Sequence, residues 1–117
     1  MTEKNRIQQL EAVIRDNSEN AFLQYSLGHE YLEIGDFKKA ITPLKKAIQL
    51  QDTYSAAYRD LGKALSLETN FEEAEEIFIR GINIAKERGD LQTAKEMTVF
   101  LKRINPDRID GENSCSY

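Results

Sequence analysis

The chain has 117 residues, of which 40% are hydrophobic and 31% are charged, and its formal net charge is −4. This size suits one domain of an ordinary soluble protein, and the acidic balance argues against nucleic-acid binding, which needs a basic surface to replace counterions. No apolar run reaches the ~18 residues that a membrane helix requires, and no apolar signal segment follows Met1, so we expect a cytoplasmic protein that does not bind membranes.

Six helices are expected in chain order, because apolar residues recur at helical spacing in six successive segments. The first covers 3–16, with a stripe formed by Ile7, Leu10, Val13 and Ile14. Two more precede position 54, two lie between 55 and 88, and the sixth covers 91–104. Residues 105–117 show no periodicity, so we expect a disordered tail there.

Turn and capping residues separate these helices. Gly35-Asp36 and Gly89-Asp90 combine a glycine that tolerates the left-handed conformation with an aspartate that caps the next helix. Thr69-Asn70 stands where a third such pair is expected, and Asn70 is the residue expected to be left-handed. The remaining caps are expected from Ser18, before the second helix, and from Asp52 or Thr53, before the fourth.

The chain also repeats itself at an interval of 34 residues. Leu27-Gly28 recurs as Leu61-Gly62, since 61 − 27 = 34, and Ala40 recurs as Ala74. A fixed period of this length indicates a solenoid whose units stack and share one core. The small residues should lie where helices cross closely, and the large residues should fill the gaps between them.

The repeat resembles the tetratricopeptide repeat, whose unit is an antiparallel helix pair of 34 residues. The residues that carry the resemblance are Leu27, Gly28, Tyr31, Gly35, Phe37, Ala40 and Leu44, then Tyr58, Leu61, Gly62, Leu65, Phe71, Ala74, Phe78 and Gly81. The resemblance implies an all-α superhelix, with one domain over 1–104 that contains units at 21–54 and 55–88. The helices at 3–16 and 91–104 would then be capping helices. The register of the last is blurred, because Lys95 and Glu96 fall where Leu61-Gly62 predicts leucine and glycine.

In proteins of this family the first helix of each pair lines a concave groove that binds other proteins. The resemblance therefore places eight residues in a peptide-binding groove: Tyr25, His29, Leu32, Glu33, Arg59, Lys63, Ser66 and Leu67. Tyr25 and His29 are four residues apart, as are Arg59 and Lys63, so each pair shares a helix face. We expect Arg59 and Lys63 to face solvent and to favour an acidic peptide, although a solvated face without a ligand fits the same pattern.

No catalytic constellation is found in the sequence. There is one histidine and one cysteine, Cys115, which excludes a histidine pair, an internal disulfide and a cysteine-based zinc site. No glycine-rich phosphate loop occurs. We therefore expect no enzyme activity, metal or cofactor. The leading hypothesis is an adaptor that binds a protein or peptide, and the alternative is a structural or self-assembling helical protein, such as a homodimer.

Overall fold

The computed structural model of the chain describes the backbone of residues 3–106 and the side chains of residues 5–106. Most of the expected tail, and Cys115 with it, lies outside the described residues. The described part contains six helices: α1 (Glu3–Asp16), α2 (Ala21–Glu33), α3 (Phe37–Leu50), α4 (Ser55–Leu67), α5 (Phe71–Glu87) and α6 (Leu91–Ile104). No strand occurs between residues 3 and 106, so the all-α prediction is confirmed. None of these helices is long and apolar enough to cross a membrane.

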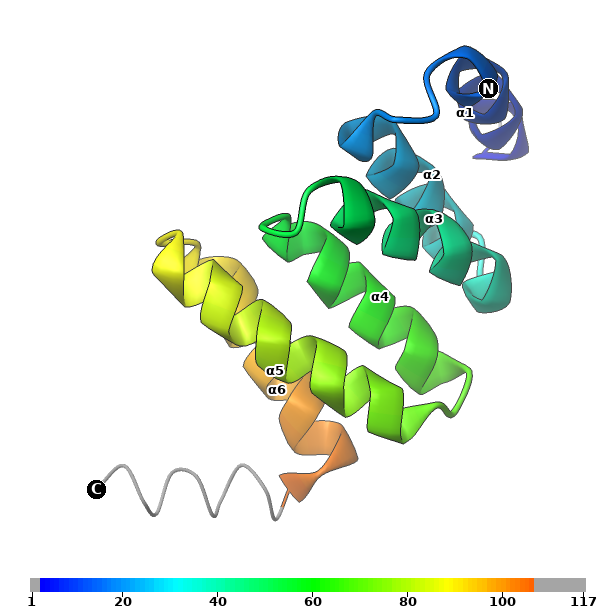
Figure 1. Cartoon of the computed structure of the whole chain (residues 1–117). Helices are drawn as coiled ribbons and strands as arrows, with labels where there is room; N and C mark the ends of the chain where they lie inside the picture. The colour runs from blue at the N-terminus through cyan, green and yellow to red at the C-terminus, as the bar shows by residue number, and fades with distance from the viewer. Residues whose placement is uncertain (1–2, 107–117) are drawn as a thin grey trace.

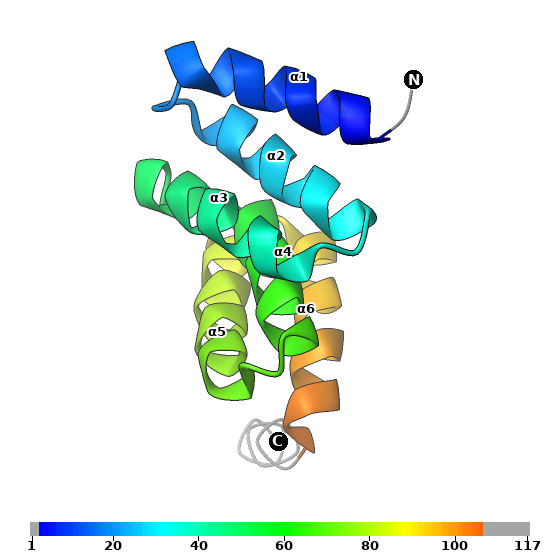
Figure 2. The same cartoon turned by 90° about the vertical axis from the view of Figure 1, so that its right-hand side faces the viewer.

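The helices stack in chain order, from α1 at the top of Figure 1 to α5 and α6 at its bottom. Each packs on the next, and the described molecule is elongated, with extents of 50 × 27 × 22 Å. Two close backbone contacts skip a helix: α2 packs on α4, and α4 packs on α6. The backbones of α3 and α5 do not come this close within residues 3–106, although an ion pair of 2.8 Å joins Lys45 of α3 to Glu73 of α5. The stack is therefore tighter on the side of α2, α4 and α6. We call the surface that these three helices share the inner face (Figures 1 and 2).

Small residues lie at the helix crossings, as the repeat predicts. Ala40 and Ala74 are fully buried. A side chain at Gly28 would place its Cβ 2.4 Å from Leu44, and a side chain at Gly62 would place its Cβ 2.3 Å from the ring of Phe78. These distances are far below van der Waals contact, so the two helices of each pair can approach this closely only where the residue is glycine.

The sixth helix begins two residues later than a strict repeat predicts. Helices α2, α4 and α6 begin at Ala21, Ser55 and Leu91, and 55 − 21 = 34 while 91 − 55 = 36. With the longer step, Leu61 corresponds to Met97, and both are buried. The additional residues lengthen the second pair, because α5 has 17 residues where α3 has 14. This longer step explains why the register of the sixth helix is blurred in the sequence.

Two of the expected caps are confirmed and two are wrong. The side chains of Asp36 and Asp90 accept hydrogen bonds of 3.3 Å from the backbone N–H groups three residues later. The second helix is capped by Asn20 rather than Ser18, since Asn20 Oδ1 accepts from Leu23 N at 3.0 Å. The fourth begins after Tyr54 with no side-chain cap, rather than at Asp52 or Thr53.

The left-handed residue in the turn between α4 and α5 is Thr69, with φ = 61°, and not Asn70 as expected. Thr69 stands 34 residues after Gly35, whose φ is 83°. The turn thus keeps the geometry of the first unit although its residue is β-branched. Such residues are uncommon in this conformation, because Cβ crowds the following carbonyl group.

Candidate functional site

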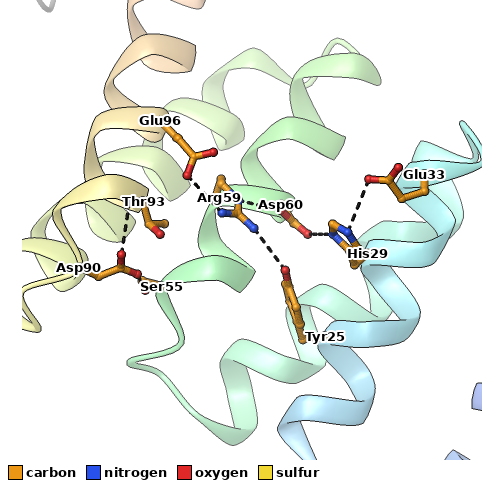
Figure 3. A network of polar contacts seen from close by, with 9 residues as sticks. All are labelled: Tyr25, His29, Glu33, Ser55, Arg59, Asp60, Asp90, Thr93 and Glu96. Atoms are coloured by element: carbon orange, nitrogen blue, oxygen red, sulfur yellow. Dashed lines mark hydrogen bonds and ion pairs between the residues drawn. The ribbon is translucent and has the colours of Figure 1, made fainter.

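The eight expected groove residues all lie on α2 or α4, the first two helices of the inner face. The structure brings three of them together directly. The rings of Tyr25 and His29 stack with their centroids 5.7 Å apart, and Tyr25 Oη accepts a hydrogen bond of 3.2 Å from Nη2 of Arg59 (Figure 3). These three residues therefore form one aromatic and cationic cluster that spans α2 and α4.

Arg59 is not the solvent-facing cation that the sequence suggests. Its side chain is only 20% exposed, and each of its three nitrogens has an intramolecular partner. Besides Tyr25, these are Asp60, with Nε 3.0 Å from Oδ1, and Glu96 of α6, with Nη1 3.3 Å from Oε1. The guanidinium therefore links all three helices of the inner face, and a ligand would have to displace one of these contacts to reach it.

Asp60 is the residue at the centre of this network, and the sequence pattern did not identify it. Its side chain is 2% exposed, and its carboxylate meets Arg59 on one oxygen and Nδ1 of His29 at 2.8 Å on the other. Because an ionised carboxylate only accepts hydrogen bonds, Nδ1 of His29 carries the hydrogen. The residue 34 positions earlier is Ser26, so the repeat gave no signal for a buried charge here.

Two further carboxylates surround the buried one. Glu33 Oε1 lies 3.5 Å from Nε2 of His29, one helix turn away, and Glu96 lies on the far side of Arg59. Figure 3 shows this chain of contacts running from Glu33 across to Glu96. The network thus contains three carboxylates against one arginine and one histidine, so the centre of the inner face does not offer a free positive charge.

Burial and Asp60 also act on the Tyr25 hydroxyl. Burial, followed by the nearby negative charge of Asp60, raises the pKa of Tyr25 to about 12, although Arg59 opposes the shift. Tyr25 therefore stays neutral over the physiological range and keeps its hydrogen. Its hydroxyl accepts from Arg59 and remains able to donate to an acceptor from outside the chain.

The other four expected residues differ in their exposure and in their contacts. Leu32 is half-buried against the core, whereas Leu67 is 51% exposed. The Ser66 hydroxyl donates to the carbonyl of Gly62 at 2.9 Å, which satisfies its hydrogen within α4. Lys63 lies over the ring of Phe100 from α6, with Nζ 5.4 Å from the ring centroid. Because the step from α4 to α6 is 36 residues, the 34-residue period did not predict that Phe100 lies on the inner face.

A pocket opens beside Lys63, between α4 and α6, with a volume of about 210 Å³. It is lined by Lys63, Ser66, Leu67, Phe78, Phe100, Arg103 and Ile104. Three of these lie on α6, where the sequence placed no groove residue. The inner face therefore continues past α4 onto the last described helix.

A second polar cluster holds α6 against α4. Ser55 Oγ donates a hydrogen bond of 2.7 Å to Asp90, the residue that caps α6. The hydrogen bonds from Ser55 and Thr93 lower the pKa of the Asp90 carboxyl. This cluster fixes where α6 begins and thereby helps to position Glu96 and Phe100.

Comparison with known proteins identifies the repeat. The family model described as TPR repeat matches residues 28–67. TPR repeat-containing protein PA0015 of Pseudomonas aeruginosa is 34% identical over 102 residues, which cover 87% of this chain and 97% of that protein. An uncharacterised protein of Methanocaldococcus jannaschii is 35% identical over 71 residues, which cover 61% of this chain and 83% of its own length.

Solved structures share the fold. Protein BPP2914 from Bordetella parapertussis superimposes with a TM-score of 0.74 at 34% identity, covering 86% of this chain and 88% of that one. A tetratricopeptide repeat domain protein from Salinibacter ruber, at 20% identity, gives 0.69 over 75% of this chain and 98% of its own. These likenesses confirm the TPR-like superhelix. The 34-residue period, the glycines at the helix crossings and the similarity to PA0015 over nearly its whole length agree, and the chain belongs to the TPR repeat family.

Proposed function

We propose that this chain is a non-catalytic adaptor whose inner face binds a peptide or a protein segment. Protein–protein interaction is the general role of the TPR fold. The observation that supports this location is the direct contact of α2 with α4 and of α4 with α6, which gives one continuous surface across three helices. The surface combines exposed apolar, aromatic and charged groups, as interaction surfaces do.

The chemistry of this surface favours a partner whose acidic groups bind at the α6 end of the inner face. Arg59 forms ion pairs with Asp60 and Glu96, so its positive charge is already compensated within the chain. Lys63 lies one turn further along α4, over an aromatic ring rather than beside a carboxylate. A carboxylate of a partner would therefore find its most favourable electrostatic interaction near Lys63.

Site-specific photo-crosslinking in the native host tests this proposal. A photoreactive residue is placed at Glu33 or Leu67, which are exposed on the inner face, and in matched controls at Lys38 or Glu76, which are exposed on α3 and α5. We expect one partner protein to be captured from both inner positions and from neither outer position. That partner is then purified, and its dissociation constant is measured with the unlabelled chain. Capture of the same partner only from Lys38 or Glu76 would place the binding surface elsewhere.

Self-assembly is the alternative function, and exposed apolar side chains support it. Phe22 of α2 is 64% exposed and Leu91 of α6 is 59% exposed, so apolar surface is available for contact with another copy. Sedimentation velocity at micromolar concentration separates the two functions. A stable homodimer that gives crosslinks only between copies would favour the alternative, whereas a monomer would favour the adaptor.

A further inference from the structure

We infer that the pocket between α4 and α6 holds one aliphatic side chain of a partner segment that carries a carboxylate next to that side chain. We call it the anchor pocket and define it by its lining residues: Lys63, Ser66, Leu67, Phe78, Phe100, Arg103 and Ile104. The inference rests on the proposed function, because it states where on the inner face the partner is held and by what chemistry.

The walls of the anchor pocket are mostly apolar and are preformed. Phe78 is fully buried at its base, and its ring stacks on that of Phe100 with centroids 5.8 Å apart. Ile104 adds an aliphatic wall, and Leu67 lies exposed at the edge. The volume of about 210 Å³ is below the roughly 300–1,000 Å³ of small-molecule sites. It therefore suits a single leucine or isoleucine side chain rather than a cofactor.

Two cations lie at the same ring. Lys63 Nζ is 5.4 Å from the Phe100 centroid and Arg103 Cζ is 5.6 Å from it. Among residues 5–106 neither cation forms an ion pair with a carboxylate, in contrast to Arg59, which binds two. A segment that inserts an aliphatic side chain here brings its neighbouring residues to these cations, and a carboxylate at that position has a complementary charge.

An acidic peptide fits this arrangement better than a nucleic acid does. Single-stranded nucleic acids need open aromatic faces on which bases stack, together with a basic track for the phosphates. The Phe100 ring is already stacked on Phe78 and has two cations over it, so little of its face remains. The chain as a whole carries a net charge of −4, which repels a polyphosphate backbone, with one negative charge per nucleotide, more strongly than a peptide with one or two carboxylates.

Fluorescence anisotropy with defined peptides tests the inference on the full chain. The probe is a fluorescein-labelled octapeptide of serine and glycine with a central aspartate–leucine–aspartate. One control peptide replaces the leucine by serine, and the other replaces both aspartates by asparagine. We expect the leucine-to-serine control to bind more than about tenfold more weakly, since it loses the buried apolar side chain. Binding of the probe should also weaken as the salt concentration rises.

Protein variants locate the site. Lys63→Gln and Arg103→Gln should each weaken probe binding about two- to fivefold and leave the asparagine control unaffected. Lys38→Gln, which removes the same charge from the exposed surface of α3, should leave the affinity unchanged. Phe100→Ala should abolish binding, but this residue packs on Phe78. Its thermal melt is therefore measured alongside, and the two charge variants carry the test if it unfolds.

Four outcomes would overturn the inference. The first is equal binding of the probe and the leucine-to-serine control, and the second is equal affinity of Lys63→Gln and Lys38→Gln for the probe. The third is tighter binding of a labelled twelve-residue oligothymidine than of the probe. The fourth is a more than tenfold gain in affinity for the probe when the chain ends at Pro106. The last would make the chain's own following segment, which contains Ile109 between Asp107 and Asp110, the occupant. If a partner is still captured from Glu33 and binds Lys63→Gln normally, the anchor pocket is wrong while the inner-face function stands.

Discussion

Arg59 and Asp60 are neighbours in sequence and form an ion pair at the inner face, with Nε 3.0 Å from Oδ1. Asp60 is 2% exposed, so Arg59 neutralises a charge that water cannot reach. His29 binds the other carboxylate oxygen and thereby ties α2 to α4. A residue that the repeat pattern marks as a ligand contact is thus first a structural contact.

Replacing Arg59 by glutamine should destabilise the fold, because it removes the cation beside the buried Asp60 carboxylate and leaves the hydrogen bond with His29. We expect the free energy of unfolding to fall by about 3 kcal/mol. This is the lower end of the range for breaking a buried ion pair, because Arg59 is itself partly exposed. Lys63→Gln is the matched control and should change stability by less than about 0.5 kcal/mol. Urea unfolding followed by circular dichroism measures both, and equal midpoints would contradict the structural role of Arg59.

Thr69→Gly should stabilise the protein. Thr69 has φ = 61°, and a β-branched residue in this conformation is strained by about 1–2 kcal/mol, of which glycine entropy in the unfolded chain offsets about half. We expect a net gain of about 0.5–1 kcal/mol in the free energy of unfolding. The reverse change, Gly35→Ala at the equivalent turn, should destabilise although there is open space around Gly35. A melting temperature that falls in Thr69→Gly would show that the Thr69 hydroxyl, which donates to Glu68 O at 2.6 Å, outweighs the strain.

Ala40→Leu and Ala74→Leu should each destabilise by about 1–3 kcal/mol, because both alanines are fully buried at close helix crossings and a larger side chain overpacks them. Ala12→Leu, at an exposed position of α1, is the control for the change of side chain. Thermal melts of the three variants test this. If Ala12→Leu lowered the melting temperature as much as Ala74→Leu, overpacking would not be the cause.

Ser55→Ala should raise the pKa of Asp90, because the Ser55 hydroxyl is the main donor that holds this pKa below its ordinary value. A lowered pKa in the folded state means that ionised Asp90 stabilises the fold above about pH 4, and that this contribution is lost as the pH falls through the folded-state pKa. Carbon-detected NMR titration of the Asp90 carboxyl in both proteins measures the shift. An identical pKa in the variant would remove Ser55 as its cause.

The sequence by itself determined the fold family, because that depends on local periodicity. Helical spacing of apolar residues, the 34-residue interval and the small residues at 28, 40, 62 and 74 each follow from short-range steric demands, and the structure places these small residues at buried crossings. The capping aspartates at 36 and 90 were found for the same reason, since each acts on a backbone amide three residues away.

Only the tertiary structure decided which inner-face residues are available to a ligand. The burial of Asp60 depends on His29, 31 positions earlier, and the engagement of Arg59 depends on Glu96, 37 positions later. Neither interval is the repeat length. The position of Phe100 beside Lys63 depends on a step of 36 rather than 34 between α4 and α6. Such contacts depend on how whole helices stack. A small change in the length of one helix rotates the side chains that follow it in the sequence onto a different face.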